Sequence, residues 1–179
     1  MLQKDNRYKV LGVFFENPRP SGIGFQLREV SRKVALAPKS VKIYLSRLEK
    51  EGLVLKKRYG KRGYPTYYAN RDSERFRYLK RMDMIMRIGE SGLLDHLDDA
   101  CSPDAIVLFG SASRGEDIMD SDIDLFLLCA EGKVDLKGFE ARLSRRISLF
   151  FSEDFGMLSP ELKNNIINGV ILKGYLKVF

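Results

Sequence analysis

The amino-acid sequence predicts an α+β protein in which three helices and a β-hairpin precede a second part that contains β-strands. Apolar residues recur at helical spacing through the first 50 residues, and the segment LVLKKRYGKRGYPTYYA at 53–69 alternates around a glycine-rich centre. Two short runs rich in apolar residues, at 106–109 and 122–128, have the length and composition of buried strands.

The two halves of the chain carry opposite charge. The formal net charge of the 179 residues is +7, but residues 1–90 contain 22 Lys and Arg against 9 Asp and Glu, whereas residues 91–179 contain 9 against 15. The net charges are therefore +13 and −6. A strongly basic segment favours a polyanion such as nucleic acid, so we expect the halves to have different partners.

Several classes of protein are disfavoured by composition. No apolar run approaches the roughly 20 residues that span a bilayer, and the segment MLQKDNRYKV has no signal-peptide core, so we expect a cytoplasmic protein without a membrane partner. Cys101 and Cys129 lack CxxC spacing and are expected to be reduced thiols rather than a bridge or a zinc site. A single histidine, His96, argues against a His-ligated metal centre.

The three predicted helices precede Gly52. Asn17-Pro18 separates the first from the second, Pro38 suits the first turn of the third, and Gly52 stands where a C-terminal cap belongs. The apolar residues that recur every three or four positions are Tyr8, Leu11, Phe14, Phe15, Leu27, Val30, Val34, Leu36, Val41, Tyr44, Leu45 and Leu48. The alternating segment after Gly52 predicts a hairpin that turns at Gly60 and Gly63.

Residues 5–70 resemble a winged helix-turn-helix domain, most closely in LREVSRKVALAPKSVKIYLSRLEKEGLV. The resemblance implies that the helix Lys39–Glu51 enters the major groove of DNA and that the hairpin wing contacts phosphates. The implied DNA-binding residues are Lys39, Ser40, Lys42 and Arg47 on the helix and Lys56, Lys57, Arg58, Lys61 and Arg62 on the wing. The alternative is a winged helix that contacts protein and whose charges are a solvated face. DNA is favoured because residues 52–71 contain no acid.

A connector follows at 71–90. The stretch DSERFRYLKRMDMIMRIG at 72–89 predicts a helix that is capped near Asp72 or Ser73 and ends near Gly89. We therefore divide the chain into a DNA-binding domain at 1–70, a connector helix at 71–90 and a second domain at 91–179. Many helix-turn-helix proteins bind DNA as dimers, so a homodimer along the connector stays open.

The segment LFGSASRGEDIMDSDIDLFLL at 108–128 carries the candidate chemistry. Asp122 and Asp124 are two residues apart, so on a strand they share one face and repel each other unless a cation lies between them. Hard oxygen ligands favour Mg²⁺ or Mn²⁺. The Gly110-Ser111 turn lets backbone approach an anion and offers a hydroxyl, and Arg114 is a further candidate phosphate contact or a solvated cation.

This arrangement of strand, Gly-Ser, ten residues, Asp-x-Asp and strand resembles the minimal nucleotidyltransferases of the DNA polymerase β superfamily, and SPELKNNIINGVILKGY resembles their C-terminal region. Over residues 91–179 the resemblance implies a mixed sheet with flanking helices. It implies ATP or another NTP bound with Mg²⁺ at Gly110, Ser111, Asp122 and Asp124, and transfer of NMP to an unknown acceptor. The acids would be both metal ligands and catalytic residues, with Arg114 among the nucleotide-binding residues.

The sequence departs from the family at a third acid. The strand RRISLFF at 145–151 lies where relatives show R-x-V-D-L, and Ser148 takes the position of the acid. Asp117 and Asp120 lie in the loop and are expected to be solvated. Two hypotheses follow: an active transferase, or a transcription regulator or antitoxin-like protein whose degenerate domain only binds nucleotide or a partner. The family often pairs with HEPN-type toxin proteins, so the resemblance permits such a partner.

Overall fold

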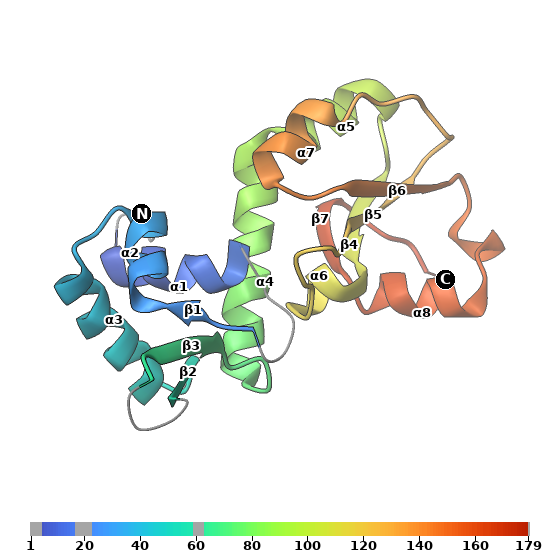
Figure 1. Ribbon diagram of the computed structural model, residues 1–179. Helices are drawn as coiled ribbons and strands as arrows, with labels where there is room; N and C mark the ends of the chain where they lie inside the picture. Colours follow the sequence, from blue (N-terminus) through green and yellow to red (C-terminus); the bar gives the residue numbers. More distant parts are fainter. Residues whose placement is uncertain (1–4, 17–22, 59–62, 179) are drawn as a thin grey trace. The chain divides into compact units, whose positions relative to one another are not determined.

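The computed structural model describes residues 5–16, 23–58 and 63–178 (Figure 1). The chain divides into two compact units, Met1–Lys80 and Arg81–Phe179. The boundary falls within helix α4 (Glu74–Ser91), which covers most of the predicted connector. The structure contains both helices and strands, as expected for an α+β protein.

The first unit combines three helices with a small antiparallel sheet. The helices are α1 (Asn6–Glu16), α2 (Leu27–Val34) and α3 (Pro38–Lys50). The strands are β1 (Phe25–Gln26), β2 (Val54–Arg58) and β3 (Pro65–Ala69), in the order β1-β3-β2. These elements lie where the sequence predicts helices and a hairpin, with β1 as an addition. The predicted hairpin turn, which includes Lys61 and Arg62, lies outside the described residues.

Helix α3 is positioned by a buried apolar stripe. Val41, Leu45 and Leu48 have no exposed surface and pack in one cluster with residues of α1, α2 and β3. Proline occupies the first turn of α3, where its missing N–H has no helical partner to lose. Beyond the helix, Gly52 takes a left-handed φ of 70°, and the Leu53 N–H donates to the Leu48 carbonyl at 2.9 Å. This ending turns the chain into β2.

A four-stranded mixed sheet forms the centre of the second unit. Its strands are β4 (Ala105–Phe109), β5 (Ile123–Leu128), β6 (Ile147–Ser152) and β7 (Val170–Gly174), in the order β6-β5-β4-β7. β4 is antiparallel to β5 and β7, whereas β5 and β6 are parallel. The mixed sheet implied by the resemblance is thus present.

Helices cover both faces of this sheet. Ile106 and Leu108 pack in a cluster that includes residues of α5 (Leu93–Cys101) and α7 (Lys137–Leu143), whereas Val107 and Phe109 pack with α8 (Pro160–Ile167). Figure 1 shows α5 and α7 on one side of the strands and α8 on the other. Because side chains alternate between the faces, a strand covered on both sides must be apolar throughout.

The end of α4 differs from the prediction. The Ser73 hydroxyl accepts the Phe76 N–H at 3.3 Å, which agrees with the predicted cap, but the helix continues past Gly89 to Ser91. A glycine inside a helix costs only about 1 kcal/mol relative to alanine. Ile88, which precedes Gly89, is completely buried in the apolar core of the second unit. The free energy gained by this burial exceeds the cost of the glycine. Gly92, with a φ of 78°, follows the helix instead.

Two expectations from composition concern the cysteines and membranes. Cys101 and Cys129 are free and half-buried. Within the described ranges, no helix combines the length and the apolar character needed to cross a bilayer.

A pair of substitutions on α3 tests the assignment of its two faces. Leu45→Ala should lower the free energy of unfolding of the first unit by about 2–5 kcal/mol, because it leaves a cavity in the core. Ile43→Ala, on the same helix with 50% of its surface exposed, should change it by less than about 1 kcal/mol. Urea unfolding monitored by circular dichroism measures both values. Equal losses would show that α3 has no distinct buried face.

Candidate functional site

The candidate site lies where β4 turns into helix α6 (Gly110–Arg114), opposite the start of β5. Phe109 is the register partner of Asp124 across the antiparallel pair, so Gly110 follows directly beside that aspartate. Gly110 has a φ of 70°, and a Cβ built on it would lie 2.3 Å from Oδ2 of Asp124. Only glycine fits this position, because a side chain there would displace the carboxylate.

Asp122 and Asp124 act on each other electrostatically. Asp122 immediately precedes β5 and Asp124 is the second residue of that strand. Burial, and secondarily the negative charge of Asp122, raise the pKa of the Asp124 carboxyl above its ordinary value. Ionising Asp124 is therefore unfavourable in this environment. A cation placed between the two carboxylates would offset their repulsion and favour the ionised form of Asp124.

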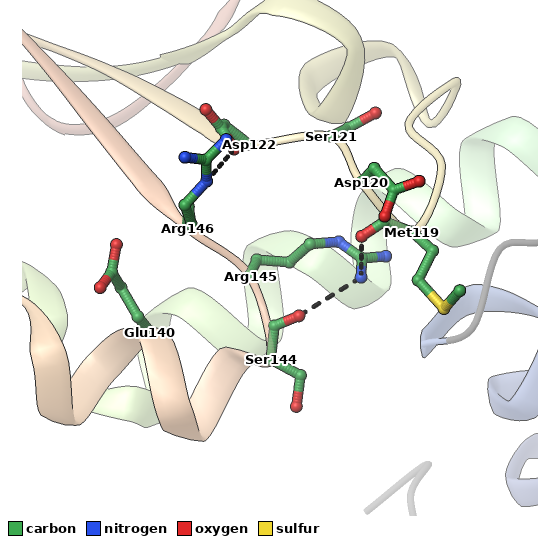
Figure 2. Close-up of a pocket in the computed structure, with 8 residues that line it drawn as sticks. All are labelled: Met119, Asp120, Ser121, Asp122, Glu140, Ser144, Arg145 and Arg146. Carbon is green, nitrogen blue, oxygen red and sulfur yellow. Dashed lines mark hydrogen bonds and ion pairs between the residues drawn. The ribbon is translucent and has the colours of Figure 1, made fainter.

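Two residues of the neighbouring segment contact Asp122. Nε of Arg146 lies 3.3 Å from Oδ1, and the hydroxyl of Ser148 donates to Oδ2 at 3.2 Å. Figure 2 shows the Arg146 side chain against Asp122. The Arg146 side chain is 81% exposed, and ion pairs so exposed contribute only about 0–1 kcal/mol. The guanidinium can therefore leave Asp122 at little cost.

Ser148 lies beside both aspartates of the candidate site. On the parallel pair of β5 and β6 it is the register partner of Asp124, so the position at which the resemblance implies a third acid adjoins the two aspartates. A hydroxyl stands there and stabilises the charge of Asp122. Among the residues that the structure describes, no group of three His, Cys, Asp or Glu side chains could hold a metal ion. The acids of the chain thus offer two carboxylates at this point.

A pocket adjoins the acid pair. It has a volume of about 420 Å³, within the usual range for small-molecule sites of about 300–1,000 Å³. Of the predicted site residues, Asp122 is part of its lining, which Figure 2 draws in full. The lining residues are Met119, Asp120, Ser121, Asp122, Glu140, Ser144, Arg145 and Arg146. The pocket therefore combines acidic, basic and hydroxyl groups beside one member of the pair.

The other predicted nucleotide-binding residues lie on α6. Ser111 is half-buried, one residue after Gly110. Arg114 is at the end of the helix, where its Nε lies 2.8 Å from Oε2 of Glu116, and both side chains are about half exposed. The structure thus places Gly110 and Asp124 in direct apposition and gives Arg114 a surface ion pair. A phosphate contact by Arg114 stays a prediction.

The expectation that Asp117 is solvated is wrong. Its side chain is only 2% exposed and lies 3.7 Å from NH2 of Arg145, which is itself 4% exposed. Burial lowers the pKa of Arg145, while the charge of Asp117 opposes that shift. Asp120 is exposed at the edge of the pocket.

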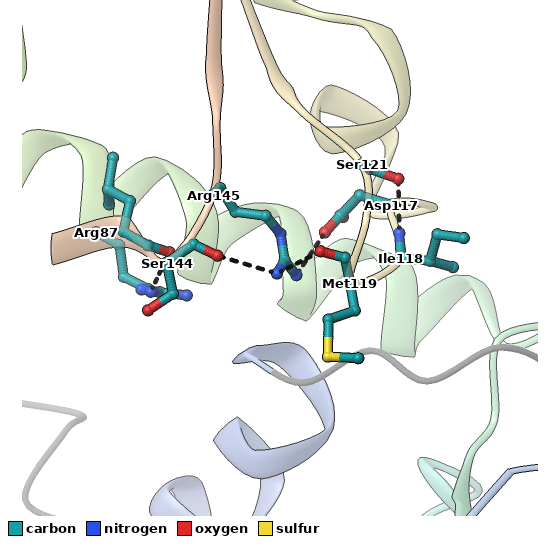
Figure 3. A network of polar contacts seen from close by, with 8 residues as sticks. Arg87, Asp117, Ile118, Met119, Ser121, Ser144 and Arg145 are labelled. Carbon is teal, nitrogen blue, oxygen red and sulfur yellow. Dashed lines mark hydrogen bonds and ion pairs between the residues drawn. The ribbon is translucent and has the colours of Figure 1, made fainter. Parts of the chain in front are cut away.

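Arg145 is a supporting residue that sequence reasoning missed. Its NH1 donates to the Met119 carbonyl at 3.1 Å, so one buried guanidinium is tied to two points of the loop before Asp122 (Figure 3). Within that loop the Ser121 hydroxyl accepts the Ile118 N–H at 2.9 Å. Burying an ion pair is expensive unless its geometry is satisfied, which indicates that the position of this loop matters. The arginine in the R-x-V-D-L pattern is the signal that could have found it.

The predicted DNA-binding residues lie on α3 and β2. Lys39, Lys42 and Arg47 are exposed on α3, where Ser40 is half-buried. Lys56, Lys57 and Arg58 are exposed on β2, and Nζ of Lys57 lies 5.4 Å from the centre of the Tyr68 ring. Their role in DNA binding stays a prediction.

Part of the second unit matches a known protein family. Residues 92–169 match the model of the nucleotidyltransferase domain. This match supports a nucleotidyltransferase domain in that part of the chain, with nucleotidyl transfer as the function it indicates. No curated protein and no solved structure was found to match the chain.

The close approach of Gly110 and Asp124 is open to direct test. Gly110→Ala should lower the free energy of unfolding by about 1–3 kcal/mol, because a left-handed φ is unfavourable for alanine and its Cβ meets a carboxylate. Gly138→Ala is the control, since a Cβ there meets nothing within 4 Å and alanine favours a helix. Guanidinium unfolding measures both. An unchanged Gly110→Ala protein would contradict the apposition.

Proposed function

We propose that the second unit binds an NTP with Mg²⁺ at Gly110, Ser111, Asp122 and Asp124 and transfers NMP to an acceptor hydroxyl. The observation that carries the proposal is the Gly110–Asp124 apposition beside Asp122, within the residues that match the nucleotidyltransferase domain. ATP is the first nucleotide to test. The pocket beside Asp122 is our candidate for the acceptor, because its polar lining suits a hydroxylated molecule.

The donor set fits a divalent cation that arrives with its nucleotide. Mg²⁺ in proteins is commonly held by one or two carboxylates together with substrate phosphates, and this site offers two. Burial, and secondarily the charge of Asp122, raise the pKa of Asp124, so a cation near Asp124 would stabilise its ionised form. Bound Mg²⁺ would neutralise charge on the triphosphate as the α-phosphorus is attacked. Gly110 brings the backbone close to Asp124, and Arg146 can move from Asp122 toward a bound phosphate.

Ser148 supports a second candidate function. Its hydroxyl occupies the register position beside Asp124 and donates to Asp122, and a hydroxyl is neither an anionic ligand nor an effective base. In this alternative the unit binds nucleotide, or a partner such as a HEPN-type protein, without catalysis. The whole chain would then be a regulator or an antitoxin-like protein. The two candidates differ in whether the reaction survives without the third acid.

Replacing Ser148 with an acid separates the candidates. We expect wild-type protein with Mg²⁺ and α-labelled ATP to label an acceptor in cell lysate slowly, and Ser148→Asp to do so at least about tenfold faster, equal to about 1.4 kcal/mol of barrier. Ser152→Asp is the matched control, because it lies on the same strand beside Leu128. Asp122→Ala and Asp124→Ala should abolish labelling.

The other outcomes of this experiment are informative. Saturable ATP binding without labelling by wild-type or Ser148→Asp protein would favour the regulator. Absence of Mg²⁺-dependent ATP binding in a folded wild-type protein would overturn the nucleotide proposal itself. Binding is measured by titration calorimetry on the same preparations.

We propose further that the first unit binds DNA as a winged helix-turn-helix domain. The proposal is supported by the order of three helices and an antiparallel strand pair, and by the exposure of cations on α3 and β2. Val41, Leu45 and Leu48 anchor one face of α3, which leaves Lys39, Lys42 and Arg47 on accessible positions. A homodimer on DNA is part of the same proposal.

Neutralising the strand cations tests DNA binding. Lys56→Gln, Lys57→Gln and Arg58→Gln together should weaken binding to DNA fragments and lower the slope of log affinity against log salt by about 3, since each phosphate contact adds about 0.9. A variant with Lys133→Gln, Lys137→Gln and Lys177→Gln removes the same charge from exposed positions of the other unit. Fluorescence anisotropy across a salt series measures both. Equal weakening by the two variants would indicate a non-specific charge effect and contradict the assignment.

A further inference from the structure

Two thiols far apart in the sequence meet at one end of the second unit. Cys101 is the last residue of α5, and Cys129 directly follows β5. The Asp104 N–H donates to the Leu128 carbonyl at 3.0 Å, which ties the chain after α5 to the end of β5. The thiol of Cys101 contributes to the raised pKa of Cys129, so the two side chains lie near each other at this end of the sheet.

The surroundings hold this pair in place. Both cysteines are half-buried and pack against the core cluster that covers one face of the sheet. A Cβ built on Gly132 would lie 2.9 Å from Sγ of Cys101, so the chain after Cys129 passes closely over that sulfur. A helix end and a strand end thus present two thiols to each other, and each remains partly accessible to a small oxidant.

We propose that Cys101 and Cys129 form an oxidisable dithiol that a peroxide converts into an intramolecular disulfide. One thiol ionises, its thiolate attacks a peroxide oxygen, and the O–O bond breaks to give a sulfenic acid and hydroxide, which takes up the released proton to form water. The second thiolate then attacks this sulfur, the S–S bond forms, and a second water leaves. Two thiols lose two electrons and two protons, and hydrogen peroxide is reduced to two waters.

The chemistry of the site sets the conditions for this reaction. Burial raises the pKa of the Cys129 thiol, and the neighbouring Cys101, Asp104 and Glu153 raise it further. The thiolate is the reactive form, so the fraction available at neutral pH is reduced and grows as the pH rises. The pair therefore reacts faster when the oxidant is abundant or the pH is high.

A bridge between these residues would close a long loop. The segment from Cys101 to Cys129 contains β4, α6 and β5, and cross-linking its ends restricts the unfolded chain more than the folded one. Oxidation should therefore raise the melting temperature by roughly 5–15 °C. The proposal does not depend on the nucleotide site, because the test below uses neither nucleotide nor metal.

The experiment treats the reduced full-length protein with hydrogen peroxide at pH 8.5. We expect both thiols to disappear together, the mass of the monomer to fall by about 2 Da, and the melting temperature to rise, with reversal of all three by dithiothreitol. Peptide mapping without reduction should show one cross-linked pair. Cys101→Ser and Cys129→Ser are the controls: each should show neither the mass loss nor the rise in melting temperature.

Three results would overturn the proposal. These are a disulfide between two chains, a mass increase from sulfinic acid on separate cysteines, and a thiol content of the wild-type protein that peroxide leaves unchanged. Circular dichroism of each variant establishes that it is folded before oxidation.

Discussion

The second unit depends on one close approach, that of the Gly110 backbone to the Asp124 carboxylate. The antiparallel register that pairs Phe109 with Asp124 brings them together, and no residue larger than glycine fits. The same register places the start of α6 beside the acid pair. The local geometry therefore requires glycine as the first residue of that helix. Burial and repulsion by Asp122 raise the pKa of Asp124, so the fold holds an unfavourable charge here. Placing two carboxylates in this way lowers the stability of the fold and favours the binding of a ligand.

Ser148 changes the balance of this site without changing its architecture. A third carboxylate beside Asp124 would add to the repulsion between the two aspartates. The Ser148 hydroxyl instead donates a hydrogen bond to Asp122, which stabilises that carboxylate. The exposed Arg146 contributes a second favourable contact to the same aspartate. Electrostatic repulsion in this site is therefore weaker than it would be among three carboxylates. Under our proposal the weaker repulsion has a cost, because the Ser148 hydroxyl is a weaker base toward the acceptor than a carboxylate would be.

Local patterns were sufficient to predict most elements, and long-range contacts were not. Strand β4 was predictable because a strand buried on both faces must be apolar, and Gly110 with the aspartates because their spacing is local. The burial of Asp117 depends on Arg145, whose side chain comes from the start of another strand. The continuation of α4 past Gly89 depends on packing of Ile88 in a core that the sequence does not display. In both places the structure depends on contacts with residues that are distant along the chain.

The opposite charges of the two halves explain why their proposed ligands need different chemistry. Residues 1–90 carry +13 and can attract the phosphates of DNA directly, whereas residues 91–179 carry −6 and include the two aspartates of the candidate site. A triphosphate approaching that site is repelled unless positive charge accompanies it. Arg146 supplies one charge and is weakly held. A divalent cation bound to the nucleotide supplies two, so the electrostatics of this chain support the metal dependence that we propose.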